Sequence, residues 1–145
     1  MLTCAEEIFP GRVVMLDANL FDVNRCATGS ASIRSHFCLC LEATPVRVCW
    51  LPINSGISPG RLPILPQEKR GHPNWVYNPK KKDSNGLSYF HPSQVWSLTP
   101  KTSCLASRHD LSTRAAPNLV LAGCLARVLS DCSLALRLAR GLEPV

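Results

Sequence analysis

Two apolar runs separated by a short polar break lie in the first third of the chain, and they read Ser35-His-Phe-Cys-Leu-Cys-Leu-Glu-Ala-Thr-Pro-Val-Arg-Val-Cys-Trp-Leu51. The break at residues 42–45 has the length of a hairpin loop and contains a proline. Both runs are bounded and composed as strands usually are. We therefore predict a β-hairpin over residues 36–51, and the rest of the fold is built around it.

The loop length also predicts the register of this hairpin. With residues 42–45 as a four-residue loop, we expect Leu41 opposite Val46, Leu39 opposite Val48, and Phe37 opposite Trp50. One face of the hairpin is then wholly apolar, while the second face places Cys38 opposite Cys49. A slip of one residue would exchange the faces, so the register matters for every site built on the hairpin.

The segments before the hairpin carry weaker signals. Arg12-Val-Val-Met-Leu16 is a short β-branched and apolar run between Pro10-Gly11 and Asp17, which predicts a strand at residues 12–16 that joins the hairpin. Residues 18–34 are polar and show no sustained period, so we expect a loop there.

Residues 52–100 contain eight of the twelve prolines, and regular structure is predicted to be sparse. Only the interval from Pro79 to Pro92 leaves room for a short helix, which Asn85-Gly86 interrupts. Residues 61–66 approximate a proline-rich ligand of SH3 domains with the basic residue out of register, so a plain loop is favoured. The segment is nevertheless too aromatic for a linker and is expected to cover part of the core with Trp75, Tyr77, Tyr89, Phe90 and Trp96.

An amphipathic helix is predicted over residues 118–140. Pro117 and Asn118 mark its start, and Gly141 and Pro144 mark its end. At about 100° per residue one face is apolar, with Leu121, Cys124, Leu125, Val128, Leu129, Cys132, Ala135, Leu136 and Ala139. This face either packs on the chain's own hairpin or docks on a partner, and self-packing is the default because a small domain needs every apolar face it has.

Together these elements predict a small, irregular α+β fold, with much of the chain in coil or disordered. The 145 residues match one domain in size. Three regions are distinguished without assigning separate domains: a strand and hairpin region at 1–54, a proline-rich, basic and mostly irregular segment at 55–117, and the helix at 118–145.

The charge distribution and the lack of a recognisable targeting signal favour an intracellular protein. The net charge is +6, with nine basic against three acidic residues at 51–117, and Lys80-Lys81-Lys82 reads as a solvated turn rather than a nucleic-acid patch. The first residues lack a basic signal-peptide region, and the longest apolar run, residues 119–126, is too short for a membrane span. The eight cysteines are then expected to be buried free thiols.

One cluster has the side chains of a zinc site: Cys26, His36, Cys38, Cys40 and Cys49. Thiolates and imidazole on one strand face, with a further cysteine opposite, have the chemistry of tetrahedral zinc ligands. The close pair is Cys-x-Cys, however, whereas structural zinc sites use a gap of about two to four residues. Free thiols are favoured, and no metal or cofactor is assigned.

No catalytic residue is assigned either, and we expect a protein that is not an enzyme. The histidines at 36, 72, 91 and 109 do not belong to any catalytic motif. His109 and Asp110 are neighbours in the sequence, but we interpret this adjacency as chance. Glu6 and Glu7 are sequence neighbours near the terminus, and the other acids are dispersed, so no catalytic carboxylate pair is predicted.

The composition supports one leading hypothesis and two alternatives for function. Cys, Trp, Ser, Arg and Pro are plentiful while Glu and Lys are scarce, as in a translated frame never selected as a protein. The leading hypothesis is therefore a chain without an evolved biochemical activity. The alternatives are a protein-interaction module that uses the C-terminal helix, with no other partner class assigned, and a small zinc-binding module at Cys38, Cys40 and Cys49.

Overall fold

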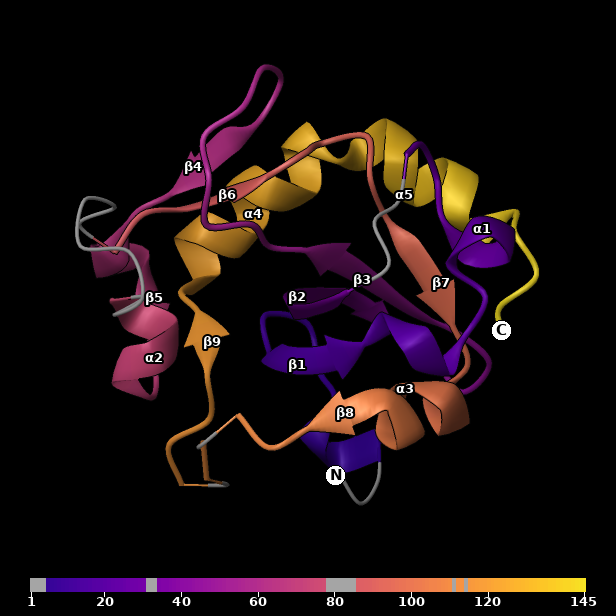
Figure 1. Cartoon of the computed structure of the whole chain (residues 1–145), viewed down its shortest axis with the longest axis horizontal. Helices are drawn as coiled ribbons and strands as arrows, with labels where there is room; N and C mark the ends of the chain where they lie inside the picture. Colours follow the sequence, from indigo (N-terminus) through magenta and orange to yellow (C-terminus); the bar gives the residue numbers. More distant parts are fainter. Residues whose placement is uncertain (1–4, 31–33, 78–85, 111, 114) are drawn as a thin grey trace.

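The computed structural model describes residues 5–30, 34–77, 86–110, 112–113 and 115–145. At its centre is a five-stranded antiparallel sheet with the order β7-β3-β2-β1-β8 (Figure 1). Its strands are β1 (Val13–Asp17), β2 (Ser35–Ala43), β3 (Val48–Pro52), β7 (Trp96–Leu98) and β8 (Ser107–Arg108). The predicted small α+β class is confirmed.

Both faces of this sheet are buried. One face is covered by α4 (Ala122–Asp131), α5 (Ser133–Arg140) and the pair of β4 (Leu62–Ile64) with β6 (Ser88–Phe90). The opposite face is covered by η2 (Ala18–Leu20), α1 (Val23–Cys26), α3 (Pro100–Ala106) and Ile8, which directly follows η1 (Ala5–Glu7). Figure 1 shows α4 and α5 along one side of the sheet and α3 along the other. Burial on both faces explains why the central strands are almost continuously apolar.

The predicted hairpin is present, but its predicted register is wrong. Leu39 lies opposite Leu51 and Cys40 opposite Trp50, and a bulge follows before Glu42. The reversal is not at 42–45: it occupies residues 44–47, where the Thr44 N–H donates to the Arg47 carbonyl at 2.8 Å. Pro45 occupies the second position of this turn, where proline's fixed φ is favoured, and the Thr44 hydroxyl accepts from the Arg47 N–H at 3.0 Å. Strand β2 therefore extends to Ala43.

The predicted strand at 12–16 is confirmed as β1, which lies between β2 and β8. In the segment expected to be a loop at 18–34, the described residues 18–30 and 34 form the two short helical turns η2 and α1 and are otherwise outside helices and named strands. Each turn begins after an aspartate, Asp17 or Asp22, whose side chain accepts a hydrogen bond from the backbone two residues on. This is the capping chemistry of short polar side chains.

The proline-rich segment contains more regular structure than predicted. Besides β4, β6 and β7 it forms η3 (Pro66–Glu68), β5 (Lys69–Arg70) and α2 (Pro73–Val76), and α3 follows at Pro100. Helices α2 and α3 each begin with a proline at the first helical position, where its missing N–H costs nothing. The prolines therefore start helices that we expected them to prevent. Of the aromatic residues, Trp75, Phe90 and Trp96 are buried as predicted, and Lys80–Lys82 lie outside the described residues.

The C-terminal helix exists, but it is shorter than predicted and divided in two. Residues Leu119 and Val120 form strand β9, which pairs with β5, and a break at Cys132 separates α4 from α5. The apolar face continues across the break because Cys132 is itself buried. No helix in the described ranges is long and apolar enough to cross a membrane.

Candidate functional site

The structure does not bring together all five residues that were considered as zinc ligands. Cys38 and Cys40 face the core that contains Trp50 and Trp96, and Cys26 lies in the same core. The His36 ring lies 6.1 Å from the Trp96 ring, measured between centroids. Cys49 faces the opposite side of the sheet, beside Leu39 and Leu51. The shift in hairpin register causes this separation, because it moves Cys49 away from the face of Cys38.

Burial also makes these thiols poor metal ligands and poor nucleophiles. It raises the pKa of Cys49 to about 11 and that of Cys40 to about 12, and it raises the pKa of Cys38 well above its usual value. Thiolates, the reactive and metal-binding forms, are therefore suppressed at neutral pH. The described residues contain no group of three or more His, Cys, Asp or Glu side chains that could hold a metal ion.

The predicted apolar face of the C-terminal helix is used by the protein's own core. Cys124, Val128, Leu136 and Ala139 are buried against the sheet, and Leu125 packs beside them. The default expectation of self-packing is confirmed. A partner for this helix remains a prediction, and substitutions such as Leu125→Asp would act first on the core.

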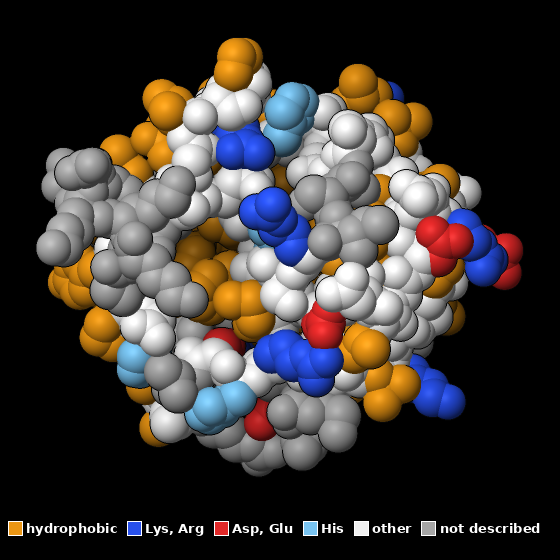
Figure 2. All heavy atoms as spheres, in the orientation of Figure 1, with side chains coloured by type: hydrophobic (Ala, Val, Ile, Leu, Met, Phe, Trp, Pro, Cys, Tyr) orange, Lys and Arg blue, Asp and Glu red, His pale blue; other side chains and the backbone are white. Residues whose placement is uncertain are grey.

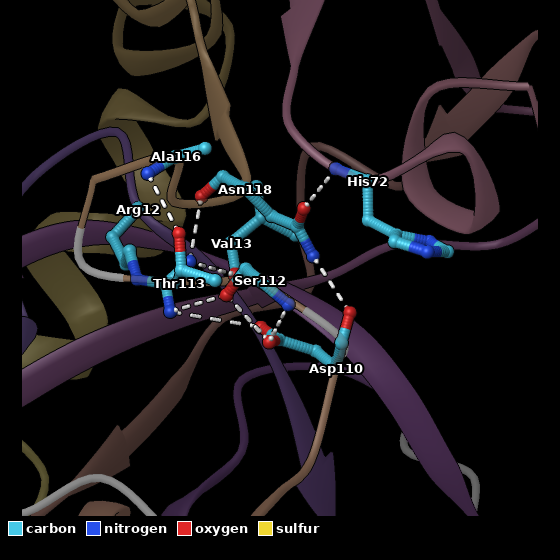
Figure 3. A network of polar contacts seen from close by, with 8 residues as sticks. All are labelled: Arg12, Val13, His72, Asp110, Ser112, Thr113, Ala116 and Asn118. Carbon is cyan, nitrogen blue, oxygen red and sulfur yellow. Dashed lines mark hydrogen bonds and ion pairs between the residues drawn. The ribbon is translucent and has the colours of Figure 1, made fainter.

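A buried polar network joins β1 to the segment that follows β8 (Figure 3). Arg12 lies directly before β1, Asp110 and Ser112 follow β8, and Asn118 directly precedes β9. Arg12 is only 5% exposed, and Asn118 is fully buried. A charged residue at the edge of an apolar strand is thus drawn into the interior, where its hydrogen bonds must be supplied by the protein.

Arg12 is held by four groups. Its Nη1 donates to the carbonyl oxygens of Val13 at 3.2 Å and Asn118 at 3.1 Å, and its Nη2 donates to Ser112 Oγ at 2.9 Å. The fourth group is the Asp110 carboxylate, whose Oδ2 lies 3.7 Å from Nη2. Burial lowers the pKa of Arg12, and the negative charges of Asp110 and Glu7 partly offset that effect.

Asn118 ties this network to α2. Its Nδ2 donates to the Asp110 carbonyl at 3.3 Å, and its Oδ1 accepts from the His72 N–H at 2.8 Å. The backbone at Gly71 passes so close that an added Cβ would lie 2.2 Å from Asn118 Oδ1, and Gly71 has a φ of +126°. Only glycine fits there.

The Arg12 network borders a cavity of about 330 Å³, at the lower end of the range for small-molecule sites. Its charged walls are Glu6, Glu7, Arg12, Arg108 and Asp110, three carboxylates against two guanidinium groups. Further lining comes from Phe9, His109, Ser112, Thr113 and Pro117. The cavity therefore combines a net negative charge with an apolar wall. We name it the Asp110 cavity.

Asp110, a residue of the cavity wall, has one carboxylate oxygen without a hydrogen bond. Its Oδ1 accepts from Ser112 N at 3.0 Å and from Ser112 Oγ at 2.6 Å. Its Oδ2 is buried and accepts no hydrogen bond, and among the described residues Trp96 Nε1 is the only other buried side-chain nitrogen or oxygen in this condition. Native proteins leave few such atoms, and each requires an explanation.

Sequence reasoning missed this site. It dismissed Glu6 and Glu7 as terminal neighbours and treated His109 and Asp110 as a chance adjacency, yet the fold brings all four to one cavity. One available signal was Arg12, a charged residue between Gly11 and an apolar run. Arg12 and Asp110 are 98 residues apart in the chain, so no local sequence pattern predicts their pairing.

No family model and no curated protein matches this chain. A proposal about function therefore has to start from the geometry of its own residues.

Proposed function

We propose that this chain is a binding protein, not an enzyme, and that the Asp110 cavity takes a small organic cation such as an amine or an amidine. The observation that carries the proposal is Asp110, a residue of the cavity wall whose buried Oδ2 accepts no hydrogen bond. An ammonium or amidinium group would supply both the missing N–H donor and a positive charge. Charge-assisted hydrogen bonds of this kind are about twice as strong as neutral ones.

Arg12 does not donate a hydrogen bond to Asp110 Oδ2. Its Nη2 lies 3.7 Å from Asp110 Oδ2, an ion-pair contact, while its hydrogen bond at 2.9 Å goes to Ser112 Oγ. The ion-pair contact leaves the lone pairs of Oδ2 without a hydrogen bond. Glu6 and Glu7 add negative charge to the same walls, which favours a cation over an anion.

The apolar wall limits the kind of cation. Phe9, which is 37% exposed, and Pro117 both line the cavity. A flat aromatic or short aliphatic body would bury against them while its cationic end reaches Asp110. Benzamidine has this shape and charge and is the probe that we would use.

The Ser112 hydroxyl supports binding over catalysis. It donates to Asp110 Oδ1 at 2.6 Å and accepts from Arg12 at 2.9 Å, so it is engaged on both sides. A serine held in this way orients the carboxylate and the guanidinium. It is not presented for attack on a substrate, which would require a positioned base and a free path to the reacting atom.

The test is a titration with benzamidine followed by proton–nitrogen NMR, with neutral benzamide as the matched ligand. We expect saturable shifts around residues 108–113 with benzamidine and none with benzamide. Asp110→Asn should weaken binding by at least about tenfold, because a charged hydrogen bond contributes roughly 1.5–3 kcal/mol. Asp131→Asn removes the same charge from an exposed position on α4 and should change binding by less than about twofold.

Equal binding of benzamide, or equal effects of the two asparagine variants, would refute the proposal. If Asp110→Asn unfolds the chain, Glu7→Gln tests the same walls with less disturbance. Saturable binding that depends on Asp110 would also count against the composition-based hypothesis of a chain without an evolved activity.

A further inference from the structure

A second cavity, of about 280 Å³, shares no lining residue with the first and has the opposite chemistry. Its walls contain the Arg61 guanidinium, the His91 imidazole and five neutral polar residues, and none of the lining residues is acidic. The neutral residues carry hydroxyl or amide donors, among them Asn54, Ser58 and Gln94. A cavity with several donors and no carboxylate suits a ligand that is rich in acceptors and negatively charged.

The guanidinium is fixed in place with donor capacity to spare. Arg61 Nη1 donates to the Gly56 carbonyl at 2.8 Å, which anchors the side chain on the loop before β4. A guanidinium has five N–H groups. Within the described part of the chain, the bond to the Gly56 carbonyl is the one hydrogen bond of the Arg61 guanidinium. Arginine binds phosphate and carboxylate oxygens through two parallel N–H donors.

His91 adds a directed donor. Its Nδ1 accepts from the Ser93 N–H at 3.2 Å, which leaves Nε2 as the ring nitrogen that can donate. The backbone of Gly60, with φ +82°, lies so near that an added Cβ would be 3.0 Å from His91 Nε2. A side chain at residue 60 would therefore crowd this nitrogen, which glycine avoids.

Other contacts hold the remaining walls. The backbone N–H and carbonyl of Asn54 pair with Tyr89, each at 2.7 Å, which joins the end of β3 to β6. The side-chain amide of Gln94 donates to the Ser30 carbonyl. The cavity is therefore built from segments that the fold already holds together.

The surroundings are positive as well. Burial is the main cause that lowers the pKa of His36; a backbone hydrogen bond at Ile53 partly offsets it, and the positive charges of Arg34 and Arg61 lower the pKa further. Figure 2 shows Lys or Arg and His side chains gathered in the upper middle of the visible face, with no Asp or Glu between them. They lie over the loop before β4 and the connection from β6 to β7.

We infer that this cavity binds the phosphate group of a small phosphorylated molecule, with Arg61 and His91 as the main contacts. Phosphate supplies the several acceptor oxygens and the charge that these donors fit. The size of the cavity fits one such group with a short attached body. A nucleic-acid backbone offers the same chemistry, so the test separates the two sources.

The experiment is an NMR titration at constant ionic strength with three probes: inorganic phosphate, methyl phosphate and a short single-stranded thymidine oligonucleotide. We expect both small phosphates to saturate with shifts confined to the cavity residues. Arg61→Gln should weaken this binding by at least about tenfold. Arg137→Gln removes the same charge from an exposed position on α5 and should change binding by less than about twofold.

A second variant adds charge and leaves Arg61 and His91 intact. Ser58→Asp puts a carboxylate into the acid-free cavity and should abolish phosphate binding, whereas Ser133→Asp adds the same charge on α5 and should leave it intact. Retained amide dispersion shows that each variant folds. Equal loss in the members of either pair, or binding of the oligonucleotide alone with shifts spread over the basic surface, would overturn the inference.

Discussion

Among the described residues, two cationic side chains are buried, and the protein holds them differently. Arg12 has a carboxylate partner, Asp110, 3.7 Å away. Lys69, on β5, is 1% exposed, and no carboxylate of the described residues lies within ion-pair distance of it. Its Nζ donates at 2.6 Å to both the Gly86 carbonyl and Ser88 Oγ, and lies 4.6 Å from the centre of the Trp75 ring.

The difference decides how each cation behaves. Burial lowers the pKa of Lys69 to about 8, because neutral oxygens and an aromatic ring compensate its charge only partly. Arg12 remains charged under all ordinary conditions. A cation with a buried anion cannot be removed without leaving that anion unpaired, whereas a cation among neutral acceptors can be removed at a smaller cost. The following predictions test this contrast.

The largest effect is expected for Arg12→Met. It leaves the Asp110 carboxylate buried beside Ser112, and such an unpaired charge costs about 3–5 kcal/mol of unfolding free energy. Urea denaturation measures the loss. The double variant Arg12→Met with Asp110→Asn should recover part of it, because no charge is then left unpaired. A loss below about 1 kcal/mol would show that Arg12 and Lys69 are equivalent.

Gly71→Ala should lower the free energy of unfolding by about 3 kcal/mol, because it disrupts the contact between the Lys69 strand and the Arg12 network. Gly71 follows the Lys69 strand and presses against Asn118 of the Arg12 network, where a Cβ has no space. Gly123→Ala is the matched control: nothing lies within 4 Å of its added Cβ, in α4. The control should gain up to about 1 kcal/mol of helix stability. Similar urea midpoints for the two variants would contradict the proposed contact.

The pH dependence of stability should reveal Lys69 and not Arg12. Between the folded pKa of about 8 and the ordinary value of 10.5, the unfolded chain keeps the Lys69 proton and the folded chain has lost it. Stability contributed by Lys69 therefore rises with pH in this window. From pH 7 to pH 9.5 the wild type should gain about 2 kcal/mol relative to Lys69→Met.

The comparison with Lys69→Met isolates the lysine, because both chains contain the same buried thiols and lose stability equally as these ionise in the unfolded state. Urea denaturation of both proteins at the two pH values gives the difference. A constant difference would mean that Lys69 titrates near its ordinary pKa.

The smallest effect is expected for Lys69→Met at pH 7, a change of about 1 kcal/mol or less. Methionine fills a similar volume and removes the cost of burying a charge, while it leaves only neutral oxygens without their donor. Equilibrium denaturation beside Arg12→Met provides the measurement. A loss as large as that of Arg12→Met would erase the distinction between the two cations.

Local patterns predicted the elements of the fold better than their pairing. The hairpin at 36–51 was predictable because two apolar runs flank a polar break, and the apolar face of the C-terminal helix was predictable from its period. The register was not predicted correctly, because the Thr44 turn and the bulge before Glu42 shift the strands against each other. The error placed Cys49 on the same face as Cys38, and the alternative of a zinc site at Cys38, Cys40 and Cys49 depended on that placement.

The candidate sites were harder to predict because their contacts are long-range. Arg12 and Asp110 are far apart in the sequence, and the antiparallel pairing of β1 with β8 and the contacts of Arg12 with Asn118 bring their segments together. Arg61 and His91 meet because β4 pairs with β6. A single sequence contains no local pattern for such pairs. The caps of α2 and α3, in contrast, are visible in the sequence as His72-Pro73 and Thr99-Pro100.

The burial of the thiols has a consequence for the reversibility of folding. Within the described residues, six of the seven free cysteines are buried, and the sheet itself lies between Cys38 and Cys49. In the folded chain these thiols are protected from oxidants, but in an opened chain all of them are exposed and ionise at their ordinary pKa. Oxidation during such an opening would link cysteines that the native sheet keeps apart. Each opening in an oxidising medium would thus remove some molecules permanently, so a reducing medium sets the lifetime of the protein.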